Sequence, residues 1–170
     1  MSCAACMKRL DAERPDISLW GRTLWTQLHG LAEKRTNLTG VQLRDLQIKW
    51  KILFDTLPNI IPCVECKQHC LEYLKAHPIQ PMMLFKEELQ VHTFVRNWIY
   101  YFHEAVNVRL RYPSFPAASL TSTYSSVNLR KLHKEYSTMM ELSIYANDIG
   151  ILSWNKWKTN MLNLFSFYEV

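Results

Sequence analysis

Residues 20–31 read Trp-Gly-Arg-Thr-Leu-Trp-Thr-Gln-Leu-His-Gly-Leu. Apolar side chains recur in this stretch at steps of three or four residues, at Trp20, Leu24, Leu28 and Leu31. The spacing predicts an amphipathic helix with one stripe directed at a core. The chain of 170 residues contains only four glycines, and its apolar residues follow the helical period throughout. These features disfavour an all-β or doubly wound α/β domain and predict an all-α fold.

Helical signals continue beyond this stretch. Asp16 is a suitable N-cap for the first helix. Thr39 and Gln42 have the spacing of a capping box, which predicts the start of a second helix. Pro62 suits the first position of a third helix that runs to about His77.

The second half of the chain contains three more predicted helices. A long fourth helix is expected from near Val91 to the residues before Pro113. Residues 112–126 are rich in Ser, Thr, Pro and Ala, which is typical of an ordered crossover or a linker. Two further helices are predicted over residues 128–147 and 153–167, with a break at residues 148–150.

Charge and hydropathy indicate which partners and which compartment to expect. The formal net charge is +5, but lysines and arginines are dispersed among acidic residues, which favours a solvated basic surface over a nucleic-acid site. No apolar run approaches the roughly 18 residues of a membrane span, and the N-terminal residues lack the apolar core of a secretory signal. We therefore expect cytoplasmic residence, with neither a membrane nor a nucleic acid as partner.

The five cysteines form two Cys-x-x-Cys pairs and one single thiol: Cys3, Cys6, Cys63, Cys66 and Cys70. In a chain without an export signal, such pairs indicate redox chemistry or metal binding. Cys63 and Cys66 would lie in the first turn of the third helix, where a spacing of three residues puts both thiols on one face. The helix N-terminus there favours a thiolate.

Cysteine spacing alone does not distinguish a zinc site from a redox site. The two pairs could bind zinc, with His69, Cys70 and His77 as spare ligands. The chain would then be a zinc-stabilised helical adaptor without enzymatic activity. More than fifty residues separate the pairs, which is long for a zinc ribbon. A basic nucleic-acid-binding bundle is a third reading.

Three segments resemble one known family in its own motif order. Gly-Arg-Thr-Leu-Trp-Thr-Gln-Leu-His at residues 21–29 is similar to the Gly-Arg-x-x-Trp-x-x-Leu-His signature of the Erv/ALR sulfhydryl oxidases. Pro-Cys-Val-Glu-Cys at residues 62–66 resembles the redox motif of that family, and residues 98–107 resemble its Trp-x-x-x-x-His-Asn-x-Val-Asn helix. The resemblance covers roughly residues 16–115.

The resemblance implies a four-helix bundle that holds FAD, here with additional C-terminal helices. It divides the chain into a leader (1–15) with a Cys-x-x-Cys pair, an FAD-binding domain (16–117) and a helical extension (118–170). The implied cofactor-binding residues are Gly21, Arg22, Trp25, His29, Tyr100, His103, Asn107, Arg109, Tyr112 and Tyr124. No metal is implied. Family members are usually homodimers packed through their first two helices.

The implied activity is thiol oxidation. A dithiol of a protein client would attack Cys63, Cys66 would pass electrons to the flavin, and molecular oxygen would become hydrogen peroxide. Cys3 and Cys6 resemble the mobile shuttle pair of some family members, although idle thiols or metal ligands are alternatives.

The chain departs from the family pattern at several positions. A second disulfide of cellular members would join the positions of Tyr100 and Ala117, so it cannot form here. Ile61 and Glu104 stand where the family has Tyr and Asn, which puts flavin contacts there in doubt. A bare redox pair is most similar to the forms of large cytoplasmic DNA viruses, which predicts a viral protein of the host cytoplasm and the virion.

Overall fold

A computed structural model describes residues 16–170 of the chain. These residues form helices and contain no strand, which confirms the all-α prediction. The α-helices are α2 (Ile17–Ala32), α3 (Gly40–Thr56), α4 (Val64–Ala76), α5 (Glu88–Leu110), α6 (Leu120–Tyr124), α7 (Leu129–Tyr145) and α8 (Ile151–Phe167). Three short 3-10 helices connect them: η1 (Leu57–Ile60), η2 (Gln80–Leu84) and η3 (Ala117–Ser119). None of the helices in residues 16–170 combines the length and apolar character of a membrane span.

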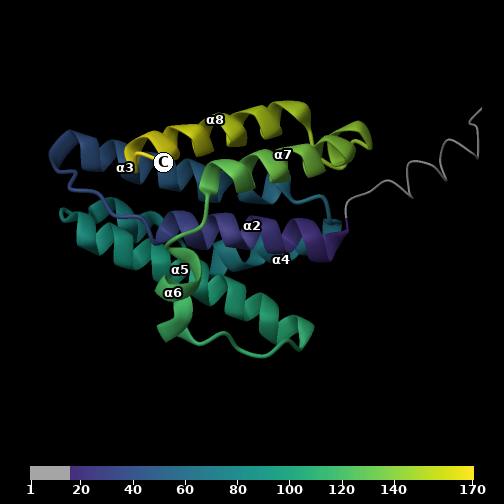
Figure 1. The fold of residues 1–170 in the computed structure, drawn as a ribbon, viewed down its shortest axis with the longest axis horizontal. Helices are drawn as coiled ribbons and strands as arrows, with labels where there is room; N and C mark the ends of the chain where they lie inside the picture. Colours follow the sequence, from purple (N-terminus) through teal and green to yellow (C-terminus); the bar gives the residue numbers. More distant parts are fainter. Residues whose placement is uncertain (1–15) are drawn as a thin grey trace, which may run out of the picture.

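The helices pack in layers around α2 and α3 (Figure 1). On one side, α7 packs along α2 and α8 packs along α3. On the other side, α5 packs against α2 and α3. The crossover between α5 and α7 is ordered and contains η3 and α6. The C-terminal helices therefore cover the bundle of the same chain.

One apolar core joins the early helices to the C-terminal pair. Five of the largest fully buried side chains come from both parts of the chain: Trp50, Phe54, Tyr136, Trp157 and Phe165. The indole N–H of Trp50 on α3 donates to the hydroxyl of Tyr168 at 2.8 Å, directly after α8. Burying a large apolar side chain stabilises a fold by about 1.5–3 kcal/mol, so the extension contributes substantially to the core.

Gly30 permits the close packing between α2 and the segment before α7. A Cβ atom built at Gly30 would lie 2.2 Å from Cγ2 of Val127 and 3.0 Å from Cδ2 of Leu129. Real Cβ atoms essentially never approach another heavy atom within 3.0 Å. A larger residue would force the Val127 side chain to move, so glycine at this position lets the crossover lie close against α2.

The predicted cap positions of the first two helices are confirmed, but the second helix lacks the side-chain bond of a capping box. Asp16 caps α2, and its side chain accepts the backbone N–H of Ser18 at 2.8 Å. Thr39 is the N-cap of α3 but makes no side-chain capping bond. The next residue, Gly40, has a φ of 55°, whereas a capping box requires helical residues directly after the cap.

Candidate active site

Cys63 and Cys66 lie at the start of α4 and are joined by a disulfide, with their Cα atoms 5.2 Å apart. The sequence predicted that Pro62 would be the first helical residue. This prediction is wrong, because α4 begins at Val64 and Cys63 is its N-cap. The sulfur of Cys63 accepts the backbone N–H of Cys66 at 3.1 Å. A disulfide sulfur thus takes the place of the usual hydroxyl or carboxylate cap. The partial positive charge of the helix N-terminus favours negative charge on this sulfur.

A cavity of about 480 Å³ lies beside Cys66, between α2, α5 and the crossover. Cys66 lines this cavity, and Cys63 is not among the lining residues. Most of the predicted cofactor-binding residues also line it: Gly21, Arg22, Trp25, His103, Asn107, Arg109, Tyr112 and Tyr124. Residues far apart in the sequence therefore line one cavity together with Cys66.

Aromatic rings of α2, α5 and α6 stack next to the cavity. Trp25 and His103 are parallel, with ring centroids 4.2 Å apart and planes 7° apart. Nε2 of His29 lies 3.0 Å from Nδ1 of His103, and the His29 ring stacks on Tyr124 at 4.6 Å. His29 is thus adjacent to the cavity-lining residues and fixes two of them.

Both histidines of this stack are held neutral. Burial, followed by the proximity of His103, lowers the pKa of His29 to about 3. Burial lowers the pKa of His103 to about 4. At neutral pH one ring therefore donates a hydrogen bond to the other, and neither brings positive charge to the stack.

Tyr100 and Glu104 hold the crossover instead of lining the cavity. The hydroxyl of Tyr100 donates to the carbonyl oxygen of Phe115 at 2.9 Å. The carboxylate of Glu104 accepts the backbone N–H of Phe115 at 3.0 Å, the amide of Asn107 at 2.8 Å and the hydroxyl of Ser114. We call these contacts the Phe115 clamp. They fasten the crossover to α5 near the positions where the second disulfide is missing.

The clamp favours the charged form of Glu104. Burial alone would raise the pKa of Glu104, but hydrogen bonds from Ser114, Phe115 and Asn107 outweigh it and lower that pKa. The carboxylate is therefore ionised at neutral pH and acts only as an acceptor.

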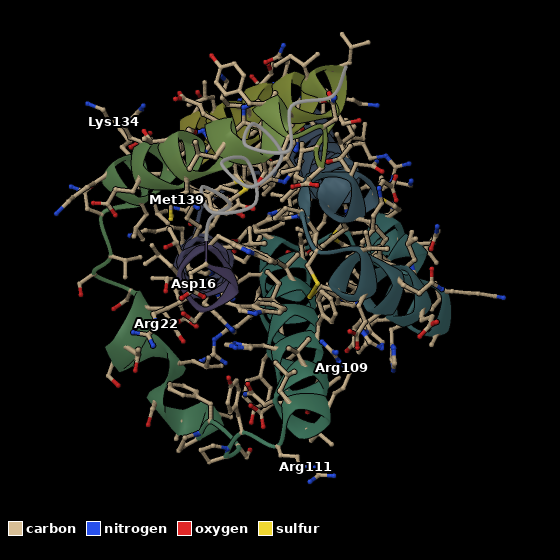
Figure 2. All side chains as sticks on the ribbon, turned by 90° about the vertical axis from the view of Figure 1, so that its right-hand side faces the viewer. Asp16, Arg22, Arg109, Arg111, Lys134 and Met139 are labelled. Atoms are coloured by element: carbon tan, nitrogen blue, oxygen red, sulfur yellow. A yellow bond between two sulfur atoms is a disulfide. The ribbon has the colours of Figure 1, made fainter. Side chains whose placement is uncertain are left out.

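Two arginines supply positive charge around the cavity. Arg22 is exposed on α2, and Arg109 lies near the end of α5, on the face of the molecule that Figure 2 shows. Nη1 of Arg109 lies 3.4 Å from a carboxylate oxygen of Glu65, the residue between Val64 and Cys66. Arg109 thus connects the cavity with the redox turn. Planar guanidinium groups suit phosphate oxygens.

Several lining residues were not predicted from the sequence. They are Ser18, Trp20, Leu24, Thr26, Leu28, Leu57, Ile61, His69, Phe102, Val106 and Leu110. Helical spacing could have found Phe102, Val106 and Leu110, which recur every four residues along α5 beside His103. His69 was considered only as a spare zinc ligand, although it lies one turn after Cys66.

The remaining cysteine of the described part is inert. Cys70 is fully buried and unpaired, as the sequence predicted. Burial raises the pKa of its thiol to about 12. Neither this thiol nor the disulfide-bonded pair presents a thiolate to zinc, which requires deprotonated sulfur. No group of three or more His, Cys, Asp or Glu side chains in residues 16–170 is arranged to hold a metal ion.

Comparison with known protein families matches residues 22–125 to the Erv1/Alr family. The chain belongs to the Erv1/Alr family. This confirms the resemblance found in the three sequence motifs and identifies the chain as a member of a family of FAD-linked sulfhydryl oxidases, which are enzymes. The match ends within the predicted C-terminal extension (118–170), so it includes α6 but neither α7 nor α8.

Two related proteins carry the same assignment. The candidate FAD-linked sulfhydryl oxidase 096R of Invertebrate iridescent virus 3 is 24% identical over 109 residues, which cover 64% of this chain and 68% of the relative. The FAD-linked sulfhydryl oxidase ERV1 of Oryza sativa subsp. japonica is 28% identical over 109 residues, 64% of this chain and 50% of the relative. No solved structure matches the chain. Since one relative is viral and the other is from a plant, viral origin stays a prediction.

The cavity of this Erv1/Alr protein fits a flat, negatively charged cofactor such as FAD. Its volume of about 480 Å³ is within the usual range of roughly 300–1,000 Å³ for ligand sites. Trp25 and His103 offer parallel rings for stacking, and Arg22 and Arg109 offer positive charge for phosphates. Asn107 is nearly buried and lines the cavity with its amide held by Glu104.

Proposed function

We propose that this chain is an FAD-dependent thiol oxidase that forms disulfides in protein clients, with molecular oxygen as acceptor and hydrogen peroxide as product. The proposal depends on one observation. Of the two sulfurs at the start of α4, the sulfur of Cys66 belongs to a residue that lines the aromatic cavity, and Cys63 is half-buried outside it. The pair therefore has one side for clients and one side for a cofactor.

Thiol-disulfide exchange at this pair is the first chemical event. A client thiolate attacks Sγ of Cys63, the Cys63–Cys66 bond breaks, and Cys66 leaves as a thiolate. The second client thiolate then attacks the client sulfur of the mixed disulfide, which releases Cys63 and leaves a client disulfide. Two electrons have moved from the client to the reduced pair. When bound, FAD supplies the acceptor that takes these two electrons and passes them to oxygen.

The cavity residues are proposed to divide the binding of FAD. Trp25, His103 and Tyr124 would stack on its rings, and aromatic pairs contribute about 0.5–1.5 kcal/mol each beyond burial. Arg22 and Arg109 would bind the pyrophosphate. The remaining proposed contacts are with Gly21, His29, Asn107 and Tyr112. Tyr100 is proposed to act indirectly, through the Phe115 clamp.

Substitution of Cys66 tests the proposal. Full-length protein purified from cells should be yellow, and anaerobic addition of dithiothreitol should bleach the flavin absorbance. Cys66→Ser should stay yellow and lose flavin reduction by at least about a hundredfold, because the sulfur beside the cavity is gone. Buried Cys70→Ser is the matched control and should bleach normally. A colourless protein that takes up no FAD, or normal bleaching of Cys66→Ser, would contradict the proposal.

Cys3 and Cys6 are proposed to relay electrons from clients to Cys63. Both cysteines lie outside the described residues. The proposal is supported by the length of chain between Cys6 and the start of α2. Cys6 lies ten positions before Asp16, and an extended chain spans at most about 3.3–3.6 Å per residue, or roughly 35 Å. Ser18, two residues beyond Asp16, lines the same cavity as Cys66.

A double variant tests this relay. Cys3→Ser/Cys6→Ser should oxidise a reduced protein client several-fold more slowly than the parent, while its rate with dithiothreitol stays unchanged because small thiols reach Cys63 directly. Oxygen consumption measures both rates. Equal rates with the protein client would end the relay proposal.

The homodimer predicted from the family remains a proposal and needs a different surface here. The outer faces of α2 and α3 are packed against α7 and α8. A second copy could use those faces only by displacing the C-terminal helices. We therefore propose that any dimer of the full chain forms elsewhere.

A further inference from the structure

His69 lies beside the redox pair but has no role in the function described so far. It follows Cys66 by three residues on α4 and lines the same cavity. Side chains three apart on a helix are neighbours, with Cβ atoms about 5–6 Å apart. Nδ1 of His69 is buried and has no hydrogen-bond partner among residues 16–170. A buried, unpartnered nitrogen next to a reacting sulfur requires a chemical explanation.

Other ionisable groups around the cavity come from three neighbouring parts of the chain. They are Arg22 on α2, His103 and Arg109 on α5, and Tyr112 and Tyr124 on the crossover. Glu65, with Arg109 as its partner, is exposed on α4 itself.

These groups are poor acceptors for a proton from a thiol. The arginines remain protonated at all relevant pH values. The Nδ1 atom of His103 is occupied by His29, and burial lowers the pKa of His103 to about 4. Burial raises the pKa of Tyr124, so its phenol keeps its proton. Among the described histidines that line the cavity, only His69 has a buried nitrogen without a hydrogen-bond partner.

The two cysteines also differ in how their negative charge would be stabilised. Cys63 receives the backbone N–H of Cys66 at the helix start. Cys66 is the donor in that contact, and no corresponding bond to its own sulfur occurs in the described part of the chain. Only the thiolate form of cysteine is an effective electron donor and nucleophile, so the reduced pair needs a proton acceptor near Cys66.

We propose that, in the reduced pair, His69 accepts the proton of Cys66 whenever solvent has protonated the thiolate that left the disulfide. The S–H bond of Cys66 breaks, an N–H bond forms at Nδ1 of His69, and the electron pair remains on sulfur. The products are a thiolate and an imidazolium, which attract each other. This inference rests on the proposed oxidase function, because it assigns how Cys66 is kept ready to donate electrons.

Alkylation of Cys66 tests the inference without measuring turnover. Full-length Cys63→Ser protein, in its state as purified, leaves Cys66 unpaired. Its reaction with iodoacetamide is followed from pH 5 to 10 by mass spectrometry of the peptide that contains Cys66. An imidazolium within about 4–6 Å lowers a thiol pKa by roughly 1–3 units. His69→Gln added to this background should therefore reduce the alkylation rate at pH 7 by about tenfold or more and move the inflection to higher pH.

Matched variants separate proton transfer from packing. His69→Phe preserves a ring without a basic nitrogen and should behave like His69→Gln, whereas the control His77→Gln, at the other end of α4, should leave the profile unchanged. Circular dichroism checks that each variant is folded. An unchanged profile in folded His69→Gln and His69→Phe, or an equal shift in His77→Gln, would overturn the inference.

The outcome is distinguishable from failure of the oxidase function. If the protein is yellow and the parent chain is bleached by dithiothreitol, but the alkylation profile ignores His69, only this inference fails. If the protein takes up no flavin, the oxidase proposal fails whatever the alkylation profile shows.

Discussion

Glu104 shows how a single substitution can change role while remaining close to a site. In place of the family Asn, its carboxylate accepts three hydrogen bonds and joins Asn107, which lines the cavity, to the backbone of the crossover. The crossover in turn supplies Tyr112 and Tyr124 to the cavity wall. Glu104 is thus a positioning residue for the proposed cofactor site.

Removing the carboxylate should loosen the cavity wall. Glu104→Ala leaves the N–H of Phe115 unpaired, which costs about 1–3 kcal/mol, and part of this loss should appear as roughly tenfold faster FAD release. Flavin fluorescence after dilution measures the release rate. The control is Glu135→Ala, because the carboxylate of Glu135 is exposed and contacts Lys131 at the surface. Glu104→Gln, which keeps one acceptor oxygen, should recover part of the effect; identical release from all variants would argue against the positioning role.

The same clamp should weaken in acid. Because the pKa of Glu104 is lowered in the folded protein, its stabilising effect is complete above the unfolded value of about 4.3 and is lost as the pH falls through the folded value. Lowering the pH below about 4 should therefore increase the rate of FAD release less in Glu104→Gln than in the parent chain.

At the scale of elements, α7 and α8 act on the bundle through buried contacts. Asn160 on α8 donates to the backbone oxygen of Lys49 at 2.8 Å, and Tyr136 on α7 lies 3.4 Å from the oxygen of Ile60, three residues before Cys63. Removing these helices would expose Trp50, which is fully buried.

A chain that ends at Ser126 should therefore lose several kcal/mol of unfolding free energy, since each large apolar side chain contributes about 1.5–3 kcal/mol. It should also associate through the uncovered faces of α2 and α3. Urea denaturation and light scattering measure the two effects. The full-length variant Gly30→Ala, whose new methyl group meets Val127, should be less stable than the parent without a change in length. Equal stability of the shortened chain would show that the extension does not support the bundle.

At the scale of the whole molecule, the sequence predicted the helices better than their packing. Stripes such as Trp20, Leu24, Leu28 and Leu31 are local, so the first helix and the later breaks could be placed from spacing alone. The position of α7 and α8 depended on whether their apolar faces meet the same chain or another one, which no local pattern decides.

In the candidate site, too, the residues of local motifs were predicted and the contacts that depend on tertiary packing were not. Trp25 and His103 belong to motifs and were predicted together, because a helical turn fixes the neighbours on each element. The Phe115 clamp joins α5 to a loop, and its partners are decided by where the loop returns. Similarly, the sulfur of Cys63 became a helix cap because α4 begins two residues later than the predicted start at Pro62.

The burial of Cys70 has a consequence for the fidelity of the proposed exchange chemistry. A third sulfur only one turn from Cys66 would ordinarily invite scrambling into a wrong intramolecular bond. Because burial raises its pKa to about 12, this thiol keeps its proton at neutral pH and does not act as a nucleophile. In the proposed cycle, the Cys63–Cys66 disulfide can therefore be reduced and re-formed repeatedly without exchange with Cys70.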